Sequence, residues 1–207
     1  GYERKIEILK EMGCNSIRMT HNPPAPEVLD LCDKHGILVI DELFDIWKNQ
    51  KYDKVNGYHI YWPQWWQKDV RNFMLRDRNH PSIICWSIGN EVIERKKLEV
   101  VTTAQKLADR VRLNDPTRPV TSALAAWDSD WEIYDPLAAV HDIVGYNYMI
   151  HKAEGDHARV PDRVMWQTES YPRDAFNNWA KVADHPYVIG DFVWTSIDYL
   201  GESGIGR

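Results

Sequence analysis

Ser82-Ile83-Ile84-Cys85-Trp86-Ser87-Ile88-Gly89-Asn90-Glu91 is the most informative stretch of this 207-residue sequence. Its mainly apolar run is short and lies between Pro81 and Gly89, which predicts a strand that is buried on both faces. The run ends on a carboxamide and a carboxylic acid. In a parallel α/β barrel, chemistry takes place at the carboxyl ends of the strands. Our first hypothesis is therefore that Glu91 acts as an acid/base group.

Six further segments have the composition of buried strands, and helical periodicity lies between most of them. The expected strands are residues 15–20, 37–40, 119–124, 142–146, 163–168 and 187–194, and the expected helices include 2–12, 27–34, 65–77, about 100–114 and 175–183. This alternation predicts parallel strands with right-handed crossovers. The closest architecture is a (β/α)8 TIM barrel, which typically needs about 250 residues. We expect residues 1–207 to be one barrel domain of a larger multidomain enzyme, with the first strand and the last helix outside the sequence.

The composition excludes several classes of protein. Hydrophobic residues make up 43% and charged residues 27%, as in globular proteins. The formal net charge of -6 argues against nucleic-acid binding, which favours a basic surface. No apolar run approaches the roughly 20 residues of a membrane span, so no membrane partner is expected. The three cysteines have neither a disulfide framework nor zinc-ligand spacing. Nothing in the sequence indicates a cellular compartment.

Polar residues follow nearly every expected strand. Glu91 and Glu169 end two of these strands, so a barrel would bring them to the same mouth. Cleavage of a glycosidic bond needs one carboxyl group to protonate the leaving oxygen and a second to attack carbon or activate water. A single glutamate at such a position is often only a solvated loop residue. The pair at matching strand ends favours a catalytic site.

Several motifs, in order along the whole chain, resemble those of glycoside hydrolase family 2. The residues that carry the resemblance are Asn15-Ser16-Ile17-Arg18-Met19-Thr20-His21-Asn22-Pro23-Pro24, Leu38-Val39-Ile40-Asp41-Glu42, Arg76-Asp77-Arg78-Asn79-His80-Pro81 through Gly89-Asn90-Glu91, Gln167-Thr168-Glu169-Ser170, and Phe192-Val193-Trp194 with Asp198-Tyr199-Leu200-Gly201-Glu202. The Asn-Glu segment is more distinctive than the segment around Glu169.

The resemblance implies a retaining mechanism with two glutamates. Glu91 would be the general acid/base, which requires a raised pKa, and Glu169 would be the ionised nucleophile. A cation should therefore lie beside Glu169, and Arg18 is the candidate. Tyr148 would hold the nucleophile through its hydroxyl group. For Arg18 and Tyr148, the alternative is a purely structural role in the barrel.

The resemblance also implies a set of residues that bind the sugar. Asn90 would bind the 2-hydroxyl, His21 another hydroxyl, and Trp194 would form a platform under the ring. Asp41 is included as a substrate-binding candidate, although the sequence does not say whether it or Glu42 reaches the mouth. The loop residues Trp47 and Trp127 are weaker candidates, for which packing is the more common role.

The implied activity is removal of terminal β-linked sugars, with β-galactosidase as the first hypothesis because of the ending at residues 198–202. β-Glucuronidase or β-mannosidase is the alternative within the family, and a non-catalytic carbohydrate-binding barrel is the alternative outside it. The expected partners are a carbohydrate substrate and accessory β-sandwich domains of the same protein, with a homo-oligomer left open. Some family members bind magnesium near the acid/base residue, but no compact ligand motif such as His-Glu-x-x-His is present, so no metal or other cofactor is expected.

Overall fold

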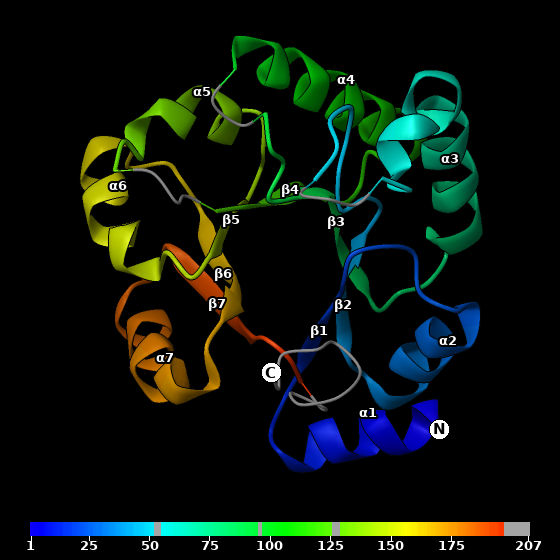
Figure 1. The fold of residues 1–207 in the computed structure, drawn as a ribbon. Helices are drawn as coiled ribbons and strands as arrows, with labels where there is room; N and C mark the ends of the chain where they lie inside the picture. Colours follow the sequence, from blue (N-terminus) through cyan, green and yellow to red (C-terminus); the bar gives the residue numbers. More distant parts are fainter. Residues whose placement is uncertain (52–54, 95–96, 126–128, 197–207) are drawn as a thin grey trace.

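The chain forms a ring of parallel strands surrounded by helices (Figure 1). The computed structural model describes residues 1–51, 55–94, 97–125 and 129–196. Its strands form one seven-stranded sheet in the order β1-β2-β3-β4-β5-β6-β7, and each neighbouring pair is parallel. The predicted architecture is thus confirmed: the fold is a nearly closed (β/α) barrel.

All seven expected strands form. They are β1 (Ser16–Met19), β2 (Leu38–Glu42), β3 (Ile83–Asn90), β4 (Val120–Leu124), β5 (Val144–Asn147), β6 (Met165–Ser170) and β7 (Val188–Val193). The helices are α1 (Tyr2–Glu11), α2 (Pro26–His35), α3 (Trp62–Asp77), α4 (Leu98–Asn114), α5 (Asp135–Ala138), α6 (Ala153–Arg159) and α7 (Ala175–Asp184). Short 3-10 turns lie at Tyr58–Ile60, Glu132–Tyr134, Ile150–Lys152 and Pro172–Asp174.

Two differences from the sequence-based expectation have clear physical reasons, the end of one strand and an additional short helix. Strand β2 continues past Ile40 through Asp41 and Glu42, because Glu42 remains paired with β3 and its side chain is fully buried. Helix α6 was not anticipated, because its seven residues are mostly polar and too few to reveal a helical period.

The two faces of the sheet carry different apolar cores. Inside the ring, Ile40, Cys85 and Trp166 form a small cluster. On the outer face, the sheet packs against the helices, and Trp86 lies edge-on to Phe73 of α3 with their ring centroids 6.0 Å apart. Because neighbouring residues of a strand point to opposite faces, each strand contributes to both cores. No helix among the described residues combines the length and apolar character needed to cross a membrane.

Side chains connect the first strand of the sheet, β1, with the last two, β6 and β7, at the carboxyl end of the barrel. The ring of His21, just after β1, stacks on Trp194, just after β7, with centroids 5.2 Å apart. Arg18 of β1 donates to the carbonyl oxygen of Thr168 in β6 at 3.1 Å. These contacts bring residues from the two ends of the chain to the mouth where the other strands also end.

Candidate active site

The guanidinium group of Arg18 lies at the centre of a buried polar network. Arg18 is 7% exposed and donates to both oxygens of Glu42, with the shortest bond, from Nη2 to Oε2, at 2.8 Å. Its Nη1 donates to Oε1 of Glu169 at 2.9 Å, and its Nη2 donates to Oδ1 of Asn90 at 2.9 Å. One planar group therefore fixes side chains from β2, β3 and β6 relative to one another.

Both carboxylate oxygens of Glu169 accept a hydrogen bond. Oε1 accepts from Arg18, and Oε2 accepts from the hydroxyl of Tyr148 at 2.9 Å. The Nε2 atom of His21 lies 3.8 Å from Oε1. Burial and the negative charge of Glu169 raise the pKa of Tyr148 above its usual value, so the phenol keeps its proton and remains a donor. Arg18 and Tyr148 thus each form a hydrogen bond to Glu169, and their support of a nucleophile stays a prediction.

Glu91 follows directly after β3, and its side chain is the more open of the two glutamates, at 13% exposed against 6% for Glu169. The Nδ2 atom of Asn147 donates to Oε1 of Glu91 at 3.0 Å. On the other side, Nζ of Lys51 lies 4.0 Å from Oε2. Glu91 thus has a fixed oxygen and a second oxygen that faces a cation.

Two non-glycine residues of the site have backbones in the left-handed region, Glu91 with a φ of 46° and Tyr148 with a φ of 60°. Such conformations cost roughly 1–3 kcal/mol each and occur preferentially at functional sites. Each is held by a bond to the next strand: the Glu91 N–H donates to Ala123 O at 2.9 Å and the Tyr148 N–H donates to Glu169 O at 2.8 Å. The chain therefore uses strained turns to direct these two side chains.

Asn90 connects the surroundings of the two glutamates. Its Oδ1 accepts hydrogen bonds from Arg18 and, at 3.1 Å, from Nδ2 of Asn147. Its Nδ2 donates to Oδ1 of Asp45 at 3.1 Å. An amide nitrogen has two hydrogens, so Asn90 can donate one more bond to a hydroxyl group of a ligand.

Glu42, rather than Asp41, faces the interior of the mouth. Besides Arg18, it accepts a bond from Ser87 Oγ at 2.6 Å, and its Oε1 lies 2.8 Å from Nδ1 of His21. Burial would raise the pKa of Glu42, but the charge of Arg18 and the bonds from His21 and Ser87 outweigh it and hold that pKa below its usual value. The role of Glu42 is to orient Arg18 and His21.

The expectation that Asp41 binds substrate is wrong. Asp41 is completely buried on the opposite face of β2, towards α2 and α3, where the nearest charges are those of Asp77 and Arg76. Burial, with a further contribution from the Asp77 carboxylate, raises the pKa of Asp41 well above its usual value. The reason is the alternation of side chains along a strand, which turns Asp41 away from the mouth when Glu42 points into it.

A cavity of about 490 Å³ adjoins the network. His21 and Asp45 belong to its wall, and most of the remaining lining is apolar, including Leu43, Phe44 and Phe73. The side chain of His21 is 23% exposed, whereas Glu42 behind it is fully buried. His21, with its stacked partner Trp194, therefore forms the accessible edge of the site, and contact of these two residues with substrate stays a prediction.

The two loop tryptophans were weaker candidates for contact with substrate, and the structure describes only Trp47 of the pair. Trp47 is fully buried, and its Nε1 donates to Ile88 O at 2.7 Å. It packs directly against Gly89, where an added Cβ would lie 2.7 Å from Nε1 of the indole. Trp47 is therefore a packing residue, which was the commoner of its two expected roles. Trp127 and residues 198–202 lie outside the described residues.

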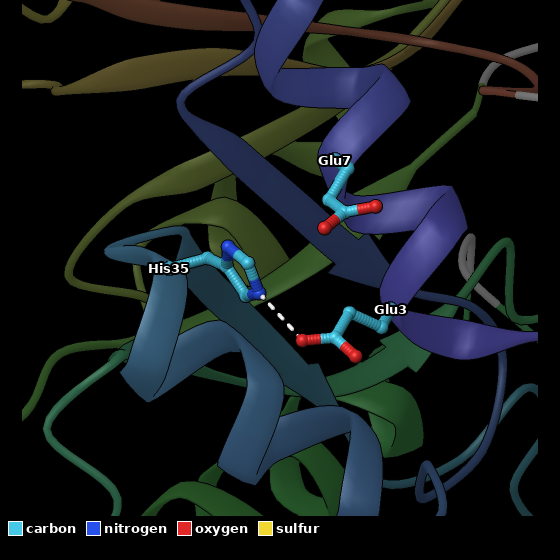
Figure 2. Close-up of side chains that lie close together, drawn as sticks. All are labelled: Glu3, Glu7 and His35. Atoms are coloured by element: carbon cyan, nitrogen blue, oxygen red, sulfur yellow. Dashed lines mark hydrogen bonds and ion pairs between the residues drawn. The ribbon is translucent and has the colours of Figure 1, made fainter.

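Metal-ligating atoms gather at two places among the described residues, and neither includes a member of the network around Arg18. One group is Glu3, Glu7 and His35 on α1 and α2 (Figure 2). Its Glu3 Oε1 already has Nζ of Lys34 at 2.6 Å, and His35 Nε2 at 3.4 Å. The other is Asp30, Asp33 and His80, in which Asp33 accepts bonds from His80 and the Ser82 N–H. Both groups are explained by protein contacts, and the absence of a resident metal stays a prediction.

Sequence reasoning missed three members of the network. Asn147, which bonds both Asn90 and Glu91, stood at a recognised strand end but received no role. Asp45 and Lys51 lie in the long connection after β2, whose path depends on tertiary packing rather than on a local pattern.

The fold and the network together define a parallel barrel with a carboxylate-based site at its mouth. One glutamate is immobilised by a cation and a phenol, and the second lies beside an amide and a lysine. Such a pair can supply a nucleophile and a proton donor to a polar substrate at the mouth.

The comparison with known proteins identifies the family. The family model described as "Glycosyl hydrolases family 2, TIM barrel domain" matches residues 2–205, and the chain belongs to this family. It is 33% identical to beta-galactosidase BoGH2A of Bacteroides ovatus, over 97% of this chain and 32% of that protein. It is 35% identical to a beta-glucuronidase of Canis lupus familiaris, over 99% of this chain and 36% of that protein.

Among solved structures, a glycosyl hydrolase family 2 member from Bacteroides cellulosilyticus is similar, with a TM-score of 0.88 and 43% identity over 94% of this chain and 24% of that one. The chain therefore spans about a third of the curated relatives it matches and a quarter of this solved structure. The relatives contain large regions beyond the barrel.

Proposed function

We propose that this barrel is the catalytic domain of a retaining glycosidase that removes terminal β-linked sugars by double displacement. The observation that carries the proposal is the placement of Glu91 and Glu169 at the ends of two strands, joined by one network through Arg18 and Asn90. Membership of a family of glycosyl hydrolases supports it. The length of the relatives supports accessory domains, such as β-sandwiches, in the complete protein.

In the first step, a carboxylate oxygen of Glu169 forms a bond to the anomeric carbon while the bond from that carbon to the leaving oxygen breaks. Glu91 gives its proton to the leaving oxygen, and a covalent glycosyl-enzyme results. Arg18 and Tyr148 hold the Glu169 carboxylate for this attack. The remaining Nδ2 hydrogen of Asn90 is available to the sugar 2-hydroxyl, a bond that strengthens in the transition state.

In the second step, water takes the place of the leaving group. Glu91, now a carboxylate, accepts a proton from this water as its oxygen bonds to the anomeric carbon, and the bond to Glu169 breaks. Both glutamates return to their starting forms. His21 and Trp194 would hold the sugar during both steps, the first by a hydrogen bond and the second by its ring face.

A neutral sugar such as galactose fits the charges of the site better than a uronic acid does. A bound uronic acid needs a cation that is not already paired. Among the described residues of the network, Arg18 pairs with Glu42 and Glu169, and Lys51 pairs with Asp45. β-Galactosidase is therefore our first proposal, and the similarity to a relative named beta-glucuronidase keeps that activity as the second.

The test is a panel of aryl β-glycosides with different sugars, assayed on the complete protein and on its Glu169→Gln variant. We expect cleavage with retained anomeric configuration and the fastest turnover on the galactoside, with activity lost in the variant. Sugar binding without cleavage of any glycoside would support a non-catalytic carbohydrate-binding barrel instead. Retention also predicts that the two carboxyl groups lie about 5–5.5 Å apart, which an inhibitor complex would measure.

A further inference from the structure

A buried lysine stands beside the proposed acid/base residue. Lys51 is only 5% exposed, although lysine is rarely buried without a partner. Its Nζ lies 2.7 Å from Oδ1 of Asp45 and 4.0 Å from Oε2 of Glu91. Lys51, although paired with Asp45, thus places its ammonium group near the oxygen of Glu91 that does not accept from Asn147.

Asp45 ties this lysine to the strand end that carries Glu91. Oδ1 of Asp45 accepts from both Lys51 and Nδ2 of Asn90, and the backbone N–H of Asn90 donates to the carbonyl oxygen of Asp45 at 3.2 Å. The connection after β2 is therefore attached by two hydrogen bonds to the segment that directs Glu91, and Lys51 holds Asp45 in place from within the connection. A displacement of Lys51 would loosen Asp45, Asn90 and Glu91 together.

We infer that Lys51 is a positioning residue for the acid/base function of Glu91. The inference rests on the proposed glycosidase function. As Glu91 gives its proton to the leaving oxygen, negative charge develops on its carboxyl group. The ammonium of Lys51, largely neutralised by the nearer Asp45 before this step, lies where it stabilises that developing charge. In the second step the same ammonium keeps the carboxylate directed at the attacking water. Lys51 needs no contact with substrate for either effect.

A lysine that assists Glu91 should change how the rate depends on the leaving group, whereas a purely structural lysine should not. Loss of general acid assistance should slow the cleavage of a poor leaving group and spare an activated one, because a very acidic phenol departs without protonation. For Lys51→Met in the complete protein, we expect kcat/KM to fall about 10- to 100-fold for the phenyl glycoside and less than about 3-fold for the 2,4-dinitrophenyl glycoside. Lys51→Arg, which keeps the charge, should restore most of the loss.

A second measurement isolates the base function. With the 2,4-dinitrophenyl glycoside, kcat of Lys51→Met should fall, and added azide should restore it, because azide attacks the glycosyl-enzyme without needing a general base. Lys34→Met is the matched control, since Lys34 also pairs with a glutamate, at 2.6 Å, but lies on the exposed surface. That control should behave as the wild type does with both substrates.

Two results would overturn the inference about Lys51. One is an equal fall of kcat/KM for both substrates in Lys51→Met, and the other is no fall for either, provided that the wild-type protein cleaves them. Should Lys51→Met fail to fold, Lys51→Gln carries the same comparison of the two substrates. A wild-type protein that cleaves no β-glycoside would instead overturn the proposed function, and the role of Lys51 with it.

Discussion

Replacement of Arg18 by Met should show how strongly the site is held by one buried cation. The guanidinium forms bonds to two carboxylates whose side chains are 0% and 6% exposed, those of Glu42 and Glu169. Methionine has a similar length but no charge. Both carboxylates would then remain in the barrel without their cation.

The size of the effect follows from the burial. Removal of one partner from a buried ion pair costs about 3–5 kcal/mol, because the remaining charge is desolvated and unpaired. For a chain of this length, each kcal/mol corresponds to about 2–4 °C in melting temperature, so we expect a decrease of roughly 6–20 °C. Activity should be lost as well, because Glu169 loses the donor to Oε1.

The stability difference between the wild type and Arg18→Met should depend on pH. In the wild type, the pKa of Glu42 lies below its usual value, so this residue contributes stability above about pH 4.5 that is lost as the pH falls through its folded-state pKa. In Arg18→Met, protonation of Glu42 should stabilise the folded protein, because it removes a buried charge that has lost its cation. The difference between the two proteins should therefore be largest near pH 7 and shrink towards pH 4.

Denaturant unfolding of the complete protein at several pH values provides the assay, with Arg18→Lys as the control. Lysine keeps the charge but not the bidentate geometry, and it should lose less stability than methionine does. A stability loss below about 1 kcal/mol, or one that does not change with pH, would refute the reasoning, since such values are typical of exposed pairs.

Four further predictions test individual contacts. Tyr148→Phe should lower kcat/KM about 10- to 100-fold through loss of a hydrogen bond to a charged group, with little change in the melting temperature; unchanged kinetics would contradict this. Asp41→Asn should leave kcat/KM unchanged and should stabilise the fold at pH 8 but not at pH 4. The pKa of Asp41 is raised in the folded protein, so its carboxyl group disfavours folding once it ionises in the unfolded chain. A lower kcat/KM would show that Asp41 does contribute to the site. Gly89→Ala should cost about 1–3 kcal/mol in denaturant unfolding, because the new Cβ overlaps Trp47; full wild-type stability would mean that the indole can move. Burial lowers the pKa of His141 to about 4, so the stability of the wild-type protein should fall as the pH drops from about 6.5 towards 4. In urea unfolding, the wild type should lose about 2 kcal/mol more than a His141→Gln variant between pH 7 and pH 5. Equal losses in the two proteins would exclude a neutral buried histidine.

The barrel could be predicted from sequence because its strands are buried on both faces and separated by helical periods. This arrangement leaves a strong local signal in runs such as Ile83–Cys85. It also predicts that the strand-end residues Asn90, Tyr148 and Glu169 lie at one mouth, since parallel strands of a barrel end together. Arg18, which bonds to Glu169, was a candidate only through the family resemblance. Periodicity is enough to identify the seven strands and the edge at which they end, although it does not reveal the short helix α6.

The sequence did not reveal which side chains of a strand point into the barrel or how the long connection after β2 packs. Asp41 and Glu42 are adjacent carboxylates, and which of them points inward depends on the register of β2 against β3, which shifts between Val39 and Ile40. Lys51 is one of several lysines in the connection after β2, and only the packing of that connection buries it. Such tertiary effects have no period that a sequence pattern could show.

The most direct test of the proposed mechanism is to trap and locate the covalent intermediate. The complete protein would be incubated with a 2-deoxy-2-fluoro β-glycoside that carries a good leaving group, digested, and mapped by mass spectrometry. We predict one added fluorosugar, attached to the side chain of Glu169, and no label in Glu169→Gln. A label on another residue, or turnover of ordinary β-glycosides with no trapped intermediate at all, would contradict the double displacement at Glu169.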